Sequence, residues 1–158
     1  MQSRLEAQNV SPAAYNAMYG LEKFVRSSKL EMPLVELVKM RASQINGCAY
    51  CIDMHSKDAR AEGETEQRLY ALSAWRETPF FTDRERAALA WTEAVTLISR
   101  GHVSEELYKE ARQHFSEEEL VNLTMAVVAI NGWNRLAIAF RAVPGDYQPA
   151  HVLASARQ

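Results

Sequence analysis

Apolar side chains recur every three or four residues through most of this 158-residue chain, which is the spacing of one face of an α-helix. No window of useful length alternates apolar and polar residues as a half-buried strand would. A chain of this length is large enough to bury one core. We therefore predict an all-α fold in which residues 1–158 form a single domain.

Capping signals divide the chain into about six or seven helices. Helix starts are predicted at Ser11–Pro12, Pro33, Thr65, Ser104 and two capping boxes, Thr82-Asp-Arg-Glu85 and Ser116-Glu-Glu-Glu119. The corresponding ends are expected near Ser28, Gly47, Gly101 and Arg141, with a helix of residues 48–62 following Gly47. In the first of these helices the expected buried side chains are Tyr15, Met18, Tyr19 and Phe24.

The segment of residues 116–141 is the most apolar, and its run 123–130 is apolar nearly all round. Polar residues interrupt it too often for a membrane span, namely Asn122, Asn131, Asn134 and Arg135. We expect it to be buried inside the domain or between subunits. Residues 36–48 and 119–133 share a short sequence similarity, since each begins with Glu-Leu-Val and ends near an Ile-Asn-Gly sequence. This similarity suggests two related helical halves.

The charge distribution limits the partners. The formal net charge is −2 and no basic block stands out, so nucleic acid and anionic membranes are not expected as partners. The N-terminal residues contain no apolar core of a signal peptide, which predicts a cytoplasmic protein. Two cysteines in such a chain indicate a redox-active or metal-binding pair rather than a secreted disulfide scaffold.

Those two cysteines, Cys48 and Cys51, are followed by His55. On a helix of 3.6 residues per turn these three side chains share one face, because the rotation from Cys51 to His55 is about 40° net. Asn46-Gly47 reads as a break in the preceding helix, so we expect Cys48 in the first turn of a new one. Unpaired backbone N–H groups and the helix dipole favour a thiolate there. An imidazole one turn away can accept the thiol proton and later return it to a leaving group.

Other interpretations of the pair are weaker. Free cysteines are often small buried hydrophobes. A structural zinc site needs four ligands, and the histidines that could join His55 have no partner ligand nearby in the sequence: His102, His114 and His151. Covalent haem attachment requires a histidine directly after the second cysteine, where Ile52 stands. A thioredoxin-type site expects a βαβ pattern that is missing here. No metal or cofactor is predicted.

Several other side chains remain ambiguous on their own. Glu36 stands among aliphatic residues, but a glutamate near a helix start is ordinarily an exposed position favoured by the dipole. Tyr50 could be a core aromatic residue or a hydroxyl donor near the thiols. We expect core or interface positions for Trp75, Trp91 and Trp133, and a solvated face for Asp53, Lys57 and Asp58.

Taken together, Glu36, Cys48-Ala-Tyr-Cys51 and His55 at these spacings resemble the signature of the AhpD-like alkylhydroperoxidases of the carboxymuconolactone decarboxylase family. The likeness covers residues 31–100, and the Asn131-Gly-Trp-Asn-Arg segment is also typical of small bacterial members. The resemblance implies an all-helical domain that assembles into homotrimers or homohexamers. It also implies a peroxidase that reduces hydroperoxides with electrons from a separate dithiol donor.

By the same resemblance, Cys51 attacks the peroxide and becomes a sulfenic acid, and Cys48 condenses with it to a disulfide. Glu36 feeds a proton relay through His55, Tyr50 or a water. The best-known peroxidase members have a histidine where Tyr50 stands here. Tyrosine is a weaker base near neutral pH, which predicts a slower relay or a different substrate. Family members that are lactone decarboxylases lack the CxxC, so that activity is disfavoured; the alternative is a non-enzymatic redox sensor whose dithiol–disulfide switch alters partner binding.

Overall fold

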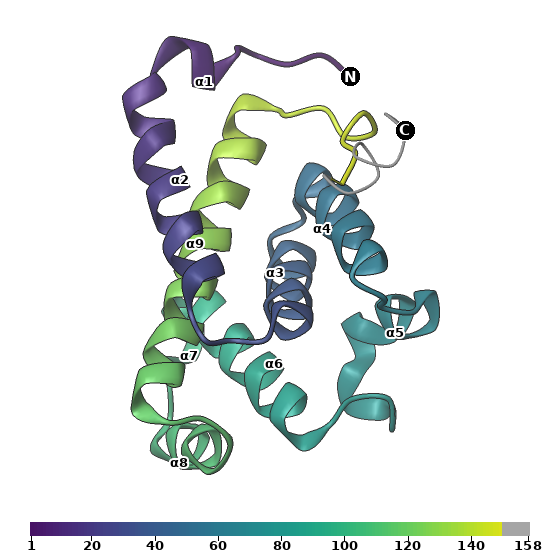
Figure 1. Ribbon diagram of the computed structural model, residues 1–158, viewed down its shortest axis with the longest axis vertical. Helices are drawn as coiled ribbons and strands as arrows, with labels where there is room; N and C mark the ends of the chain where they lie inside the picture. Colours follow the sequence, from purple (N-terminus) through teal and green to yellow (C-terminus); the bar gives the residue numbers. More distant parts are fainter. Residues whose placement is uncertain (150–158) are drawn as a thin grey trace.

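The computed structural model describes residues 1–149, and within them every regular element is helical (Figure 1). The elements are α1 (Ala7–Val10), α2 (Pro12–Ser27), α3 (Met32–Asn46), α4 (Ala49–Ala61), α5 (Glu66–Ala71), the 3₁₀ helix η1 (Leu72–Glu77), α6 (Asp83–Thr96), α7 (Ile98–Gly101), α8 (Glu105–His114) and α9 (Glu117–Phe140). The all-α prediction is confirmed. The count exceeds the expected six or seven because α1 and α7 are four-residue helices that periodicity cannot detect.

Local hydrogen bonds at the helix starts agree with the capping signals. Thr82 and Ser116 each form the predicted capping box with the glutamate three residues later. Ser11 precedes α2 as expected, but its side chain makes no capping bond, so Pro12 marks that start. The predicted end at Gly101 was wrong for the long helix. That helix, α6, stops at Thr96, and Gly101 ends the short α7 instead.

The centre of the molecule is α3, which packs against α4, α6 and α9 (Figure 1). Residues 34–40 are all buried, so this helix has no solvent-facing stripe over two turns. Two of the buried residues are charged, Glu36 and Lys39, at 2% and 1% exposure. Burial of an unpaired charge is costly, so each must have a partner inside the fold. Lys39 forms an ion pair with Glu22 of α2.

The longest helix, α9, lies beside α2 and packs against α3 and α6. By length and composition alone α9 could cross a membrane, and a third of its most apolar window is buried in the fold. Within the single chain it is only partly enclosed, since Val121, Val128 and Ile138 are exposed, and burial between subunits stays a prediction. The most buried helix is therefore α3 and not α9.

One further expectation was wrong. In α2 the buried residue is Val25, whereas Tyr19 and Phe24 are about half exposed and Tyr15 and Met18 are half-buried. The echoed Ile-Asn-Gly sequences also adopt different structures. Gly47 ends α3 in the left-handed region, whereas Gly132 lies within α9. At Gly132 a Cβ atom would stand 2.7 Å from Met18 Cε, so glycine allows α2 and α9 to approach closely.

Candidate active site

The turn between α3 and α4 sets the position of the cysteines. Gly47 has φ +69°, a left-handed conformation that glycine adopts without a Cβ clash. The N–H groups of Gly47 and Cys48 then donate to the carbonyls of Gln44 and Ser43, which closes the end of α3 in a Schellman-type arrangement. Cys48 is the N-cap residue of α4, and its sulfur accepts a hydrogen bond from the N–H of Cys51. The expected helix start is confirmed, with Cys48 one residue before the first turn.

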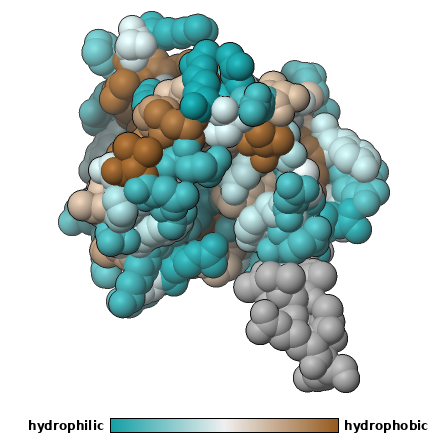
Figure 2. All heavy atoms as spheres, turned by 90° about the horizontal axis from the view of Figure 1, so that it is seen from above, coloured by the Kyte–Doolittle hydropathy of each residue, from teal (hydrophilic) through white to brown (hydrophobic). Residues whose placement is uncertain are grey.

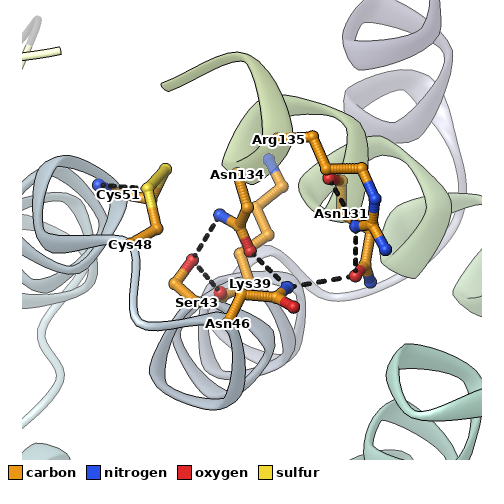
Figure 3. The surroundings of a disulfide bond; sticks show 8 residues. All are labelled: Lys39, Ser43, Asn46, Cys48, Cys51, Asn131, Asn134 and Arg135. Carbon is orange, nitrogen blue, oxygen red and sulfur yellow. Dashed lines mark hydrogen bonds between the residues drawn. A yellow bond between two sulfur atoms is a disulfide. The ribbon is translucent and has the colours of Figure 1, made fainter. Parts of the chain in front are cut away.

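A network of side-chain amides ties this turn to α9 (Figure 3). Asn46 Nδ2 donates to Asn131 Oδ1 at 3.0 Å and to Asn134 Oδ1 at 2.8 Å. Asn134, which is fully buried, donates in turn to Ser43 Oγ at 3.0 Å. Because buried amides are stable only when hydrogen-bonded, this network fixes the end of α3, and with it the CxxC turn, against α9.

Cys48 and Cys51 form a disulfide, with their Cα atoms 5.3 Å apart (Figure 3). Both residues are 1% exposed, and they pack in a small apolar cluster with Ala42 and Ile130. The structure is therefore that of the oxidised pair. It shows that these two sulfurs can be joined within the fold, which a merely buried pair of hydrophobic residues would not require.

The buried carboxylate of α3 meets the histidine of α4. His55 Nδ1 and Glu36 Oε2 are 2.8 Å apart, and the two residues are 3% and 2% exposed. A carboxylate can only accept, so Nδ1 carries the proton and Nε2 of the neutral ring holds a lone pair. Nε2 is buried and has no hydrogen-bond partner within residues 1–149. The hydrogen bond with Glu36 thus orients the ring, and His55 lines the same cavity as Cys51, one helical turn away on α4.

Opposing effects act on the Glu36 carboxyl. Burial by itself raises the pKa of Glu36, but the hydrogen bond with His55 and the positive charges of Lys39 and Arg26 outweigh it. The pKa is held below its ordinary value, so this carboxyl is ionised at neutral pH. The expectation from position alone, an exposed glutamate near a helix start, is wrong.

A cavity of about 630 Å³ opens beside the disulfide. Cys51 and His55 line it, together with residues of α2, α9 and both terminal segments. Tyr50 also lines it and is half-buried, and burial, followed by the nearby Tyr19 and Asp53, raises the pKa of Tyr50 above its usual range. Thus the five predicted site residues gather at one place, with Glu36 behind His55 and Cys48 behind Cys51.

The C-terminal segment contributes a residue that sequence reasoning missed. Tyr147 lines the cavity and donates its hydroxyl to Asp58 Oδ1 at 2.7 Å. Lys57 Nζ donates to the carbonyls of Gly145 and Tyr147, and Asp53 accepts from the N–H of Gly145. The predicted solvated face of α4 is therefore half-buried under residues 145–147. No periodic pattern marks this segment, so the sequence offered no signal for it.

Trp133 also lines the cavity, whereas Trp75 and Trp91 lie in the core as expected. Metal ligation was considered as well. Among residues 1–149, Glu36, His55 and Asp58 have possible ligand atoms within 4.8 Å of one another. In this structure Glu36 is hydrogen-bonded to His55 and Asp58 accepts from Tyr147. His151, considered for zinc, lies outside the described residues.

Comparison with known proteins places this site in context. Residues 11–94 match the Carboxymuconolactone decarboxylase family, CMD. The uncharacterized protein YdfG of Bacillus subtilis (strain 168) is 45% identical over 139 residues, which are 88% of this chain and 95% of YdfG. Among solved structures, a protein of unknown function from Agrobacterium tumefaciens, provisionally assigned as the antioxidant defence protein AhpD, is 44% identical with a TM-score of 0.89. That match covers 92% of this chain and 100% of the Agrobacterium chain.

The debrominase Bmp8, in its apo form, has the same fold with a TM-score of 0.78 at 23% identity, over 88% of this chain and 75% of that one. At that identity the likeness concerns the fold alone. A single fold thus carries proteins with different names and reactions, and the activity of each must be argued from its own site.

Proposed function

Since this chain belongs to the carboxymuconolactone decarboxylase family, in its AhpD-like part, we propose that it is a thiol peroxidase that reduces organic hydroperoxides through a Cys48–Cys51 disulfide cycle. The observation that carries the proposal is His55, whose ring is oriented by the buried, ionised Glu36, whose Nε2 has no hydrogen-bond partner within residues 1–149, and which lines one cavity with Cys51. Residues 1–158 act as one catalytic unit in this proposal.

The reaction begins with the dithiol form. His55 Nε2 takes the proton of the Cys51 thiol, and the thiolate attacks the O–O bond of the hydroperoxide ROOH. Cys51 becomes a sulfenic acid while RO⁻ leaves, and the imidazolium returns the proton so that ROH is released. Cys48 then attacks the sulfenic sulfur, forming the disulfide and one water. A dithiol donor reduces the disulfide, so the sum is ROOH plus a dithiol giving ROH, water and the donor's disulfide.

The two cysteines take different roles because of their surroundings. Cys51 lines the cavity and lies one helical turn from His55, so a hydroperoxide in the cavity meets this sulfur. Cys48, at the N-cap, lies on the protein side of the pair and is suited to resolve the sulfenic acid. The dipole at the start of α4 favours both thiolates.

Tyr50 serves as a hydroxyl donor in the proposal rather than as a base. Its raised pKa keeps it protonated at neutral pH. From the rim of the cavity it can donate a hydrogen bond to the leaving oxygen, while His55 alone handles the proton of the thiol.

The partners follow from the cycle. A dithiol reductant must reach the disulfide, and we propose a reducing compartment such as the cytoplasm. We also propose self-association, as a homotrimer or homohexamer. It is supported by the exposed Val121 and Val128 on α9 and by a hollow nearby that Trp91 and Tyr108 line.

Mass measurement tests the cycle. Reduced protein treated with one equivalent of cumene hydroperoxide should lose two hydrogens, and a dithiol such as dihydrolipoamide should support many turnovers. Cys51→Ser should abolish both. Cys48→Ser should instead trap a sulfenic acid that dimedone labels at Cys51. If Cys51→Ser turns over peroxide as fast as the unaltered protein, the proposal fails. Disulfide formation without multiple turnover would favour a redox sensor.

A further inference from the structure

The cavity beside Cys51 is much larger than hydrogen peroxide requires. Its volume is about 630 Å³, whereas a water molecule takes about 30 Å³ of the liquid. Roughly twenty water-sized molecules would therefore fill it. Cavities of about 300–1,000 Å³ are typical of sites that enclose molecules with rings and branched chains. A peroxide of two oxygens would make few contacts here, so size alone favours a bulky substrate.

One wall of the cavity is built from three aromatic rings. The ring centroid of Trp133, on α9, lies 5.6 Å from that of Tyr15 and 5.2 Å from that of Tyr19, both on α2. Tyr15 and Tyr19 are edge to face at 6.3 Å. Trp133 also packs against the cluster that holds the two cysteines. The aromatic wall therefore runs from the rim of the cavity to the sulfurs.

Apolar side chains also reach the surface at this end of the molecule. Figure 2 looks onto the end of the molecule where the N-terminal segment and the end of α9 lie, and hydrophobic side chains interrupt its polar surface there. Tyr19 is 46% exposed at the rim of the cavity. Exposed rings that are not covered by the described chain favour a ligand with an aromatic face.

Charge and hydrogen bonding narrow the class further. The guanidinium that lines the cavity, Arg26, already pairs with Glu22 at 3.3 Å. The Asp58 carboxylate is likewise occupied by Tyr147. The described lining sets the carboxylates of Glu6, Glu22 and Asp58 against this one guanidinium, so its charge is unfavourable to an anionic substrate. A neutral ligand fits this lining better.

The third tryptophan offers a hydrogen bond to such a ligand. Trp75 and Trp91 donate their indole N–H groups to Glu93 and Thr124, at 2.9 and 3.0 Å. Within residues 1–149 the indole N–H of Trp133 makes no such bond, and its ring borders the cavity. It can donate to an oxygen close to an aromatic ring.

We propose that this cavity is a binding site for neutral hydroperoxides that carry an aromatic ring, with the ring against Trp133 and Tyr19 and the O–O bond at Cys51. The identity of the substrate class rests on the proposed peroxidase function, but the binding of a ring does not. The alcohol formed by reduction keeps the ring and lacks the reactive bond, so it reports on the site without turnover.

Binding is measured by calorimetry on the oxidised full-length protein, with 2-phenyl-2-propanol and tert-butanol as probes. These alcohols differ only in the phenyl ring, and burying it should tighten binding by at least about tenfold. Trp133→Leu should remove that preference, and Trp133→Phe should restore most of it. Tyr19→Leu, at a half-exposed position where folding is not at risk, should weaken the phenyl probe about three- to tenfold. Tyr70→Leu is the matched control, because Tyr70 is 75% exposed and does not line the cavity.

Turnover of cumene hydroperoxide, tert-butyl hydroperoxide and hydrogen peroxide tests the peroxidase activity separately from the binding of an aromatic ring. We expect kcat/KM to fall in that order, with a ratio of at least about tenfold between the first two that Trp133→Leu abolishes. Equal binding of the two alcohols overturns the ring site, even where all three peroxides are reduced. Selective binding of 2-phenyl-2-propanol without reduction of any peroxide leaves the ring site standing and refutes the peroxidase.

Discussion

Replacing Glu36 by glutamine tests whether this buried carboxylate acts on Cys51 through His55. Glutamine keeps the shape of the side chain and can present its amide oxygen where Glu36 Oε2 lies 2.8 Å from His55 Nδ1, so the hydrogen bond stays and the charge is lost. A hydrogen bond to a charged group contributes about 1.5–3 kcal/mol and one between neutral groups about 0.5–1.5 kcal/mol. The protonated imidazole therefore loses about 1–1.5 kcal/mol of stabilisation, which is about a tenfold change in an equilibrium.

The assay is alkylation of Cys51 by iodoacetamide in a Cys48→Ser background, followed by mass spectrometry across pH. At neutral pH we expect Glu36→Gln to react about tenfold more slowly, because fewer thiols transfer their proton to His55. The two curves should converge at alkaline pH, where a thiol ionises without help. Glu31→Gln is the matched control, since Glu31 stands at the exposed start of the same helix and pairs with Arg84.

Combining Glu36→Gln with His55→Gln tests whether Glu36 acts on Cys51 through the imidazole. In a His55→Gln background, Glu36→Gln should cost nothing further, because its effect passes through the imidazole. The relay would be refuted if Glu36→Gln slowed alkylation of Cys51 equally at every pH, or if it caused the same tenfold loss of rate in the His55→Gln background. Glu36 would then be a structural residue.

Three further outcomes follow from the fold. Asn134→Ala removes two hydrogen bonds from the buried network and should lower the free energy of unfolding, measured in urea, by about 1–3 kcal/mol. Asn122→Ala, on the same helix but without a side-chain hydrogen bond to residues 1–149, should lower it less. Equal losses in the two variants would contradict a stabilising role of the network. Because the pKa of Glu36 lies below its ordinary 4.5 in the folded state, its stabilisation is present above that pH and is lost as the pH falls through the folded pKa. The difference in unfolding free energy between unaltered protein and Glu36→Gln should then shrink in acid, and a difference independent of pH would argue against this ionisation. Val121→Glu should reduce the particle mass seen by light scattering, and an unchanged oligomer would exclude this face of α9 as the interface.

The features that local chemistry controls could be predicted from the sequence. The capping boxes at Thr82 and Ser116 depend on hydrogen bonds within four residues, so the sequence pattern alone predicts them. The same holds for the turn at Gly47 and the helix start at Cys48, which place Cys51 and His55 one turn apart. This half of the candidate site follows from spacing alone.

The burial of Glu36 and the position of Tyr147 depend on tertiary packing, which the sequence pattern does not show. Helical periodicity identifies the apolar face of a helix, but it cannot say that α3 is enclosed on all sides. Glu36 therefore looked like a surface glutamate, although it stands between two pairs of aliphatic residues. Its role as the acceptor for His55, 19 residues later, depends on the packing of α3 against α4. Tyr147 was missed for a similar reason, because its partner Asp58 is 89 residues away and nothing local connects them.

Residues near the start of the chain and residues after α9 both line the cavity, which has a practical consequence for work on the purified protein. Ser3 and Leu5 line it from the N-terminal segment and Tyr147 from the segment after α9, and the backbone N–H of Arg4 donates to the carbonyl of Phe140 at the end of α9. An affinity tag fused at the N-terminus therefore begins only a few residues from the entrance used by any ligand. Binding and rate constants from tagged and cleaved preparations should be compared before either is assigned to the native protein.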